Sequence, residues 1–198
     1  MADTAQPERL AQIIVSQLQP QLQKLLPLPI EAVAAACGIL AIQPLTTDGF
    51  EGGLIQDEYK SEGFILVKAG ARQDRTRFTI AHELGHFVNL RHLAPPGSDK
   101  LLCTRDDLAA SGLAQTGRHG MEAQANEFAA NLLMPAGALQ VQPFMKGSPE
   151  ISRILALQNL CGVSKEAAAR RYAELHGGEF AVVFSKDGVV VRAVRSRD

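Results

Sequence analysis

The chain has 198 residues, a formal net charge of −1 and 46% hydrophobic residues. This composition suits one or two small domains with a substantial hydrophobic core. The balanced charge offers no electrostatic attraction for nucleic acid or anionic membranes, so we expect no direct nucleic-acid binding and no membrane association. No N-terminal segment has the layout of a signal peptide, and no apolar run is long enough to span a bilayer.

The three cysteines are Cys37, Cys103 and Cys161. Their odd number and wide spacing do not resemble a disulfide framework or a cysteine-based zinc site. We therefore predict reduced thiols and a cytoplasmic location.

The N-terminal part of the chain predicts two helical segments followed by a small sheet. Residues 7–26 carry apolar side chains at helical spacing, interrupted by Pro20, which should kink or break the helix. Residues 29–38 predict a short helix, with Pro29 near its start and Gly38 past its end. Three short apolar runs then predict strands: Ile39–Ile42, Gly53–Gln56 and Gly63–Val67.

The stretch RFTIAHELGHFVNL, residues 77–90, places His82 and His86 four residues apart, with Glu83 directly after the first histidine. On a helix, residues four apart share one face, about 6 Å apart along the axis, so two imidazoles can converge on one Zn²⁺. Glu83 is rotated by about 100° from His82, which suits a general base that acts on a water rather than a third ligand. Asp74 is the expected N-terminal cap of this helix. The alternative is a buried helix that carries two histidines by coincidence.

After this helix the sequence predicts a long irregular region and then further helices. The irregular region runs from Ala94 to about Gly120, and a second strong helix begins near Met121 and ends at Pro135. Residues 151–175 predict a helix, a turn at 162–164 and another helix, with Ser164 as N-cap. Two β-branched runs flanking Asp187-Gly188 predict a type I′ hairpin. We expect residues 1–150 to form one unit, with residues 151–198 packed on it.

A zinc peptidase site needs a third protein ligand and leaves the fourth position for water. Of the other histidines, His92 lies past the motif helix and His176 in a predicted loop, while His119 precedes the second helix and stays a rival. Glu122 is the better candidate, because Asn126 lies on the same helical face and can orient a ligand. An equally acceptable reading is that Glu122 is a solvated residue in the first turn of a helix.

Together, RFTIAHELGHF and EAQANEFAANLLMP resemble the ImmA/IrrE family of zinc metallopeptidases over about residues 28–175. The resemblance implies that Glu122, four residues before Asn126, binds one Zn²⁺ per chain together with the two histidines. It also implies an α+β fold: a zincin-like core, with a small N-terminal sheet and the H-E-x-x-H helix, followed by helix-turn-helix-like helices; the terminal hairpin completes the chain. Characterised members cleave a helix-turn-helix repressor in stress-response or mobile-element switches, which implies such a protein substrate here.

Two departures from the family pattern bear on activity. The segment between His86 and Glu122 is longer than usual and contains Cys103, and the chain carries only a short hairpin where other members have a sensor domain. Because a long loop between two ligand-bearing helices must pass near the metal, residues 93–120 can restrain activity, with Cys103 filling the open position of zinc. A surface loop with an idle thiol is the alternative.

The expected mechanism assigns Glu83 as general base, with a further donor for the oxyanion. The candidates for that donor are Arg118, His119, Tyr59 and Tyr172. Peptide substrate is expected to pair with the sheet edge near Gly53–Gln56, unless that edge is simply solvated.

Two rival functions remain at the sequence level. Residues 151–175 can be a DNA-binding helix-turn-helix in which Lys165, Arg170 and Arg171 contact phosphate. Glu166 and Glu174 reduce the net positive charge of this segment. The chain can also be a protein-interaction module whose zinc site is not used for catalysis. Glu83 argues against that reading, because a structural zinc site has no use for its carboxylate.

Overall fold

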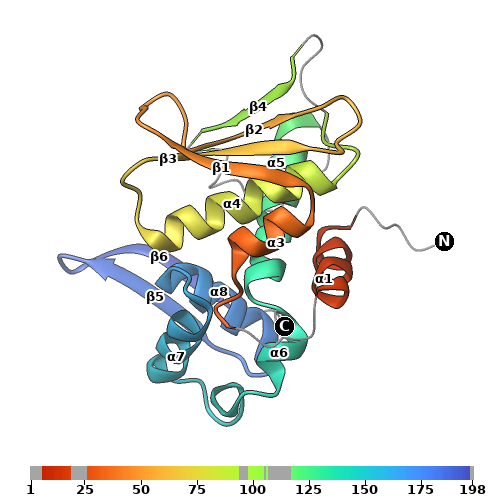
Figure 1. Ribbon diagram of the computed structural model, residues 1–198. Helices are drawn as coiled ribbons and strands as arrows, with labels where there is room; N and C mark the ends of the chain where they lie inside the picture. The colour runs from red at the N-terminus through yellow and green to blue at the C-terminus, as the bar shows by residue number, and fades with distance from the viewer. Residues whose placement is uncertain (1–5, 19–25, 94–97, 105, 107–116, 197–198) are drawn as a thin grey trace.

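The computed structural model describes residues 6–18, 26–93, 98–104, 106 and 117–196, and the structural statements below concern these residues. Figure 1 shows a sheet at one end of the molecule, helices α4 (Gln73–Val88) and α5 (Gly117–Leu133) beneath it, and a second group of helices with a hairpin at the other end. The fold is mixed α+β with a zincin-like core, as the sequence predicted.

The sheet has four strands in the order β1-β3-β2-β4. The strands are β1 (Ile39–Leu45), β2 (Gly52–Gln56), β3 (Gly63–Lys68) and β4 (Lys100–Cys103). Strand β1 runs parallel to β3, whereas β2 runs antiparallel to both of its neighbours. Buried and more exposed residues alternate along β3, so one face of the sheet packs on helices and the other meets solvent.

Strand β4 was not predicted. It lies inside the region from Ala94 to Gly120 that the sequence indicated to be irregular, and that prediction is wrong for these four residues. Only Leu101 and Leu102 are aliphatic in this strand, and two residues are too few to show the alternating pattern of a strand. Pairing with β2 makes these residues extended. Most of the remaining loop, and the predicted helical extension through Pro20, lie outside the described residues.

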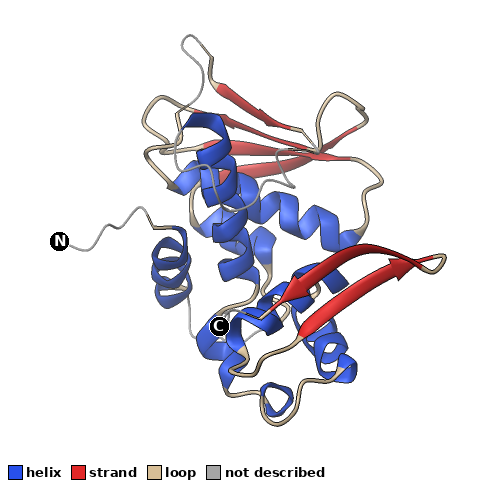
Figure 2. Ribbon diagram, turned by 180° about the vertical axis from the view of Figure 1, so that it is seen from behind, coloured by secondary structure: helices blue, strands red, loops and turns tan. Residues whose placement is uncertain are grey.

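One hydrophobic core runs from the sheet past α4 and α5 to the elements at the other end of the molecule (Figure 2). Leu54 and Ile65 from the sheet and Leu84 and Phe128 from the helices are among its fully buried members. Burying such a side chain stabilises a fold by about 1.5–3 kcal/mol. Helices α1 (Pro7–Gln17) and α3 (Ile30–Ala36) add to the same core.

Two helix boundaries differ from expectation. Arg72, rather than Asp74, is the N-cap of α4; Asp74 lies in the first turn and pairs with the Arg72 guanidinium at 2.8 Å. Helix α5 begins at Gly117, about one turn before Met121, so Glu122 lies beyond the first residues of the helix. Its side chain is only 2% exposed, which contradicts the reading of a solvated first-turn residue.

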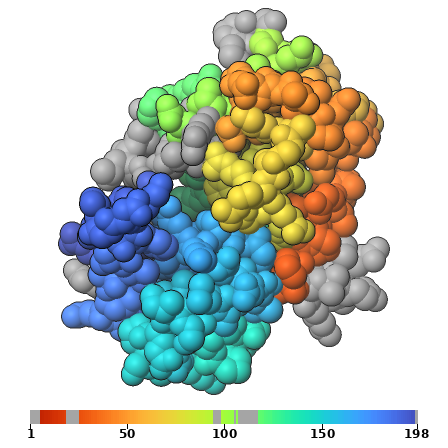
Figure 3. Space-filling model, turned by 90° about the vertical axis from the view of Figure 1, so that its left-hand side faces the viewer, coloured from red at the N-terminus to blue at the C-terminus, as the bar shows by residue number. Residues whose placement is uncertain are grey.

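The second group of elements follows α5. It comprises α6 (Ala136–Gln140), a 3₁₀ turn (Pro143–Met145), α7 (Ile151–Cys161), α8 (Lys165–Leu175), β5 (Ala181–Lys186) and β6 (Val189–Arg195). Ser164 is the N-cap of α8 as predicted, accepting a hydrogen bond from Ala167 N–H at 3.1 Å. Asp187 and Gly188 both have positive φ, as a type I′ turn requires. Figure 3 shows the hairpin, in blue, at the surface beside these helices.

Two buried arginines join the second group to the first. Arg77 of α4 donates to Leu28 O at 2.9 Å and to Cys161 O, the last residue of α7, at 3.4 Å. Arg171 of α8 donates to Met134 O and to Asn131 Oδ1, both at 2.9 Å. The division of the chain at residue 150 stays a prediction. No helix among the described residues is long and apolar enough to cross a membrane.

Candidate metal centre and active site

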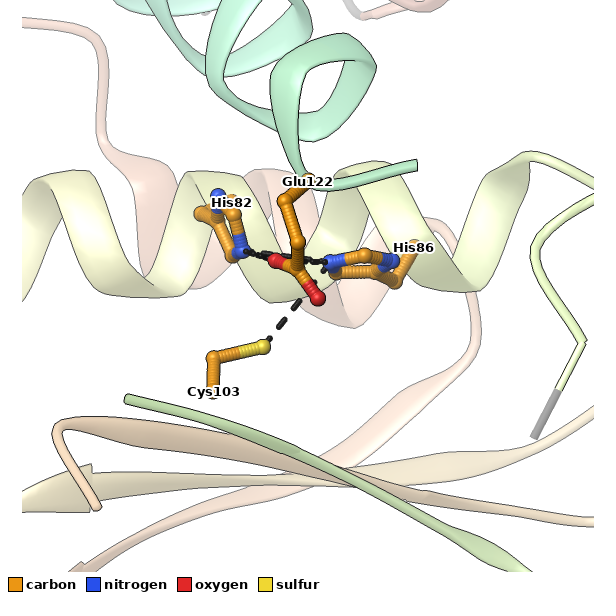
Figure 4. A group of neighbouring side chains, drawn as sticks. All are labelled: His82, His86, Cys103 and Glu122. Atoms are coloured by element: carbon orange, nitrogen blue, oxygen red, sulfur yellow. Dashed lines mark hydrogen bonds and ion pairs between the residues drawn. The ribbon is translucent and has the colours of Figure 1, made fainter. Parts of the chain in front are cut away.

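Four buried side chains from three elements converge beneath the sheet (Figure 4). His82 and His86 come from α4, Glu122 descends from α5, and Cys103 approaches from β4 on the opposite side. One ligand-type atom of each side chain lies within 4.8 Å of the others. The two Nε2 atoms are 3.1 Å apart, and Glu122 Oε2 lies 3.1 Å and 3.2 Å from them.

These separations fit a single tetrahedral metal ion. With metal–nitrogen and metal–oxygen bonds of about 2.0–2.1 Å and tetrahedral angles, ligand atoms lie about 3.3 Å apart. The observed separations of 3.1–3.2 Å among the two imidazoles and the carboxylate differ little from that value. Two imidazole nitrogens and a carboxylate oxygen gathered this closely form a donor set that suits one shared cation. The residues present therefore fit a divalent metal.

Each of the two clustered histidines is held through its other ring nitrogen. His82 Nδ1 lies 2.8 Å from Asn126 Oδ1, the partner expected from the helical spacing. His86 Nδ1 lies 3.0 Å from Nδ1 of His92, whose Nε2 lies 3.1 Å from Gln124 Oε1. If Nδ1 carries the proton in both ligands, each Nε2 lone pair faces the cluster, which is the tautomer that metal binding needs.

His92 was placed past the motif helix by sequence reasoning and given no role. It is 1% exposed, because the chain turns back after α4 and brings its ring against that of His86, with centroids 4.9 Å apart. The only signal in the sequence was a further histidine six residues after His86.

Burial and mutual contact set the charges of the cluster. Burial lowers the pKa of His86, and burial and the neighbouring His86 lower the pKa of His92 to about 4. For Glu122, burial alone raises the pKa, but the contacts with His82 and His86 outweigh burial and hold the pKa well below the ordinary value. At neutral pH, His86 and His92 are therefore uncharged and Glu122 is ionised, as metal ligation demands.

Glu83 lies between α4 and strand β2. Its side chain is fully buried, and a Cβ atom built on Gly52 would fall 2.5 Å from Glu83 Oε1 and 2.5 Å from Thr79 Cγ2. Only a glycine at position 52 lets the backbone of β2 lie directly on this carboxylate. The rotation of Glu83 away from the face that carries the two histidines thus directs its carboxylate toward strand β2. Gly52 was not recognised from the sequence.

The family profile of the IrrE N-terminal-like domain, peptidase family M78, matches residues 46–172, which include every residue of the cluster. The chain belongs to this family. It is a metallopeptidase, and its substrate is a protein. No curated protein sequence shows significant similarity to the chain.

The end of the motif helix of this peptidase is fixed by Lys60, which sequence reasoning also missed. Its Nζ donates to the carbonyl oxygens of His86, Asn89 and His92 at 2.7–2.8 Å. His86 lies in the last turn of α4, where carbonyls lack a partner within the helix, and Asn89 and His92 follow its end; Asn89 O also accepts from His92 N–H at 3.0 Å. An ammonium is favoured at this negative end of the helix dipole. Burial lowers the pKa of Lys60 to about 8. The contact ties the loop between β2 and β3 to the end of α4.

Helices α4 and α5 approach closely at Gly85. A Cβ built there would lie 2.8 Å from Phe128 Cδ1 and 3.4 Å from Ala125 Cα. The glycine between the two histidines therefore lets α5 come near enough for Glu122 to reach them.

The four predicted oxyanion donors lie in different places. Arg118 is the one tied to the cluster, with Nε 3.7 Å from Glu122 Oε1, while His119 is exposed on the first turn of α5 and is not among the clustered ligand atoms. Tyr59 is 82% exposed in the loop before β3. Tyr172 is fully buried in α8, where its ring packs against those of His176 and Phe180. His176 itself contacts Gly147 O at 2.9 Å.

The expected docking edge for substrate is already paired. Strand β2, which includes Gly53–Gln56, lies between β3 and β4, and each of its residues from Gly52 to Ile55 has a partner on both sides. A peptide can therefore pair with β2 only where β4 has moved away.

Proposed function

We propose that this chain is a zinc-dependent endopeptidase in which His82, His86 and Glu122 hold one Zn²⁺ and Glu83 is the general base. The observation that carries the proposal is the convergence of two imidazole Nε2 atoms and one carboxylate oxygen within 3.1–3.2 Å of one another, beside a fully buried glutamate. Two histidines and one carboxylate form a ligand set that zinc peptidases use. Zinc is favoured over Mg²⁺ and Ca²⁺ because those ions prefer all-oxygen sites.

Zn²⁺, when bound, polarises the scissile carbonyl and lowers the pKa of a water molecule toward about 7. Glu83 accepts the proton of the attacking water and later passes it to the leaving amine. Its burial against Gly52 keeps the carboxylate in place and excludes bulk solvent. Asn126 and His92 fix the two ligating rings, so neither ring must reorient when substrate binds. Arg118 is the proposed oxyanion donor, because it already lies beside Glu122.

The proposed substrate is a helix-turn-helix repressor, cleaved in the cytoplasm as part of a stress-response or mobile-element switch. Support comes from the membership of the chain in the IrrE N-terminal-like family and from the resemblance of its two motifs to repressor-cleaving members. None of the three cysteines forms a disulfide, which agrees with a reducing compartment.

The charges of α7 and α8 favour the peptidase over a DNA reader. Arg171 is 3% exposed and donates to backbone and side-chain oxygens within the protein. Arg170 pairs with Glu166 at 3.1 Å, and Arg192 of the hairpin pairs with the same carboxylate. Of the three proposed phosphate contacts only Lys165 lies outside these pairs, so this helix pair offers little net positive charge to a phosphate backbone.

Incubation of the zinc-loaded chain with a helix-turn-helix repressor encoded beside it tests the proposal directly. We expect a single cut, located by mass spectrometry of the products, that disappears when a chelator removes the metal and returns on addition of zinc. A salt-dependent gel shift with the DNA upstream of the same genes provides the contrast. Metal-dependent DNA binding without cleavage would contradict the proposal and favour the regulator.

A further inference from the structure

Cys103 is the one member of the buried cluster that the proposed mechanism does not use. It lies opposite Gly52 in the β2–β4 ladder, and Glu51 N–H donates to Cys103 O at 2.9 Å. Directly opposed residues of an antiparallel pair direct their side chains to the same face of the sheet, about 4.5–5.5 Å apart. On that face Gly52 meets Glu83, so the Cys103 thiol lies beside the proposed general base.

The thiol also reaches the metal ligands. Cys103 Sγ is 3.8 Å from His86 Nε2, and the side chain is fully buried (Figure 4). A zinc–sulfur bond of about 2.3 Å and a zinc–nitrogen bond of about 2.05 Å at the tetrahedral angle place the two atoms about 3.6 Å apart. The observed separation agrees with that value. Cys103 approaches from the side of the sheet while the other three ligands come from the helices, as the fourth corner of a tetrahedron requires.

Strand β4 is fixed on both sides. Leu101 is 6% exposed, pairs with Leu54 and belongs to the core. On the helical side, Arg118 Nη2 donates to Leu102 O at 2.6 Å while its Nε lies 3.7 Å from Glu122 Oε1. The residue before Cys103 is thus tied to the helix that carries the third ligand, which holds the thiol over the metal position.

We propose that the Cys103 thiolate is the fourth protein ligand of the metal and that β4 thereby holds this peptidase in a latent state. The proposal rests on the proposed zinc site. Four protein ligands close a zinc site, as in structural centres, and leave no position for the water on which Glu83 acts. The same strand occupies the edge of β2 with which an extended substrate would pair. Activity then requires that the thiolate leave the metal, taking up a proton from solvent, and that β4 separate from β2.

Cobalt spectroscopy of the full-length chain tests the ligand directly. With one Co²⁺ per chain, the unaltered protein should show a near-ultraviolet sulfur-to-cobalt charge-transfer band in addition to the visible bands of a tetrahedral site. Cys103→Ser should lose the charge-transfer band and keep the visible bands. Cys37→Ser, a substitution of a half-buried thiol at the C-cap of α3, is the matched control and should keep both. The spectrum of the unaltered protein needs no variant, so it decides the question even if Cys103→Ser does not fold.

The cobalt experiment distinguishes a failure of the Cys103 proposal from a failure of the proposed metal site. One bound Co²⁺ with no charge-transfer band in the unaltered protein would overturn the role of Cys103 and leave the proposed peptidase intact. A chain that binds no Co²⁺ at all would overturn the proposed metal site itself, and the fourth ligand with it.

The latent state is tested by activity and metal retention together. Because only molecules with a displaced thiolate are competent, Cys103→Ala should cleave a short unstructured peptide about tenfold faster or more. The same variant should lose zinc to a competing chelator at a concentration at least about tenfold lower, since a thiolate ligand is gone. A folded, zinc-loaded Cys103→Ala or Cys103→Ser chain with unchanged cleavage and unchanged zinc retention would refute the proposal.

Discussion

The substitution Gly85→Ala should change the stability of the protein in two opposing ways, through helix propensity and through packing. Alanine in a helix interior is favoured over glycine by about 1 kcal/mol, so helix propensity alone predicts a more stable protein. Against this, the new Cβ would lie 2.8 Å from Phe128 Cδ1, whereas ordinary contact begins near 3.4 Å. Overpacking of a rigid core costs about 1–3 kcal/mol. We therefore expect a net loss of up to about 2 kcal/mol, which for a chain of this length lowers Tm by several degrees.

The effect on the metal should exceed the effect on stability. To relieve the contact, the ring of Phe128 must move by about 0.6 Å relative to Gly85, and because Phe128 is only 1% exposed we expect α5 to move with it. This displacement lies between the two histidines of α4 and Glu122 of α5. Metal–ligand distances tolerate only about 0.2 Å. Zinc affinity should consequently fall by more than about tenfold. Replacing a residue that only orients a metal ligand costs about tenfold at the least, so this loss should be larger.

Metal titration against a chromogenic chelator, together with thermal unfolding of the metal-free protein, measures both quantities. Gly137→Ala is the matched control: Gly137 also lies in a helix, α6, but its Cβ would meet nothing within 4 Å, so this variant should gain stability and keep its affinity. If Gly85→Ala is more stable than the parent and binds zinc equally well, the close approach of α4 and α5 does not set the geometry of the site.

Three further predictions concern single side chains. Glu83→Gln should abolish peptide cleavage while metal analysis still finds about one zinc per chain, and a variant that loses its metal would instead make Glu83 a ligand. Glu122→Ala should strip zinc, whereas Glu127→Ala should not. Asn126→Ala should weaken zinc affinity or activity by about 10–100-fold, because Asn126 orients His82 without touching the metal. Equal zinc retention in all three variants would move the third ligand elsewhere. Ser164→Ala should lower the free energy of unfolding by about 1 kcal/mol in a denaturant titration, through loss of the α8 cap, and an unchanged midpoint would show that water replaces the hydroxyl.

Local rules of the sequence predicted much of this fold. The period of apolar residues indicated α4, the turn residues indicated the hairpin, and a serine before an alanine-rich run indicated the start of α8. Asp74 is not the cap because α4 begins at Gln73, so Asp74 is already helical, and its acidic side chain contributes from the first turn instead.

Contacts between distant segments could not be read from a single sequence. The pairing of β4 with β2 depends on an open strand edge in the folded sheet, and the lysine that closes the motif helix comes from a loop 26 residues before His86. Gly52 carries no functional group, so its importance appears only when the Glu83 carboxylate is seen to occupy the place of the missing side chain. Burial of Glu122 likewise follows from the packing of α5 on α4 rather than from its neighbours in sequence.

The guanidinium of Arg77 has a consequence for how this chain unfolds. It lies on the helix that bears both histidines and bonds to the last carbonyl of α7, so separating the C-terminal helices from the rest would leave a buried cation short of one acceptor. Loss of a hydrogen bond to a charged group costs about 1.5–3 kcal/mol. Arg171, bonded to Met134 O and Asn131 from the other direction, adds a second penalty of the same kind. The region after residue 150 and the region before it should therefore melt in a single cooperative transition, and a chain ending at residue 150 should lose its metal-binding helix to partial unfolding.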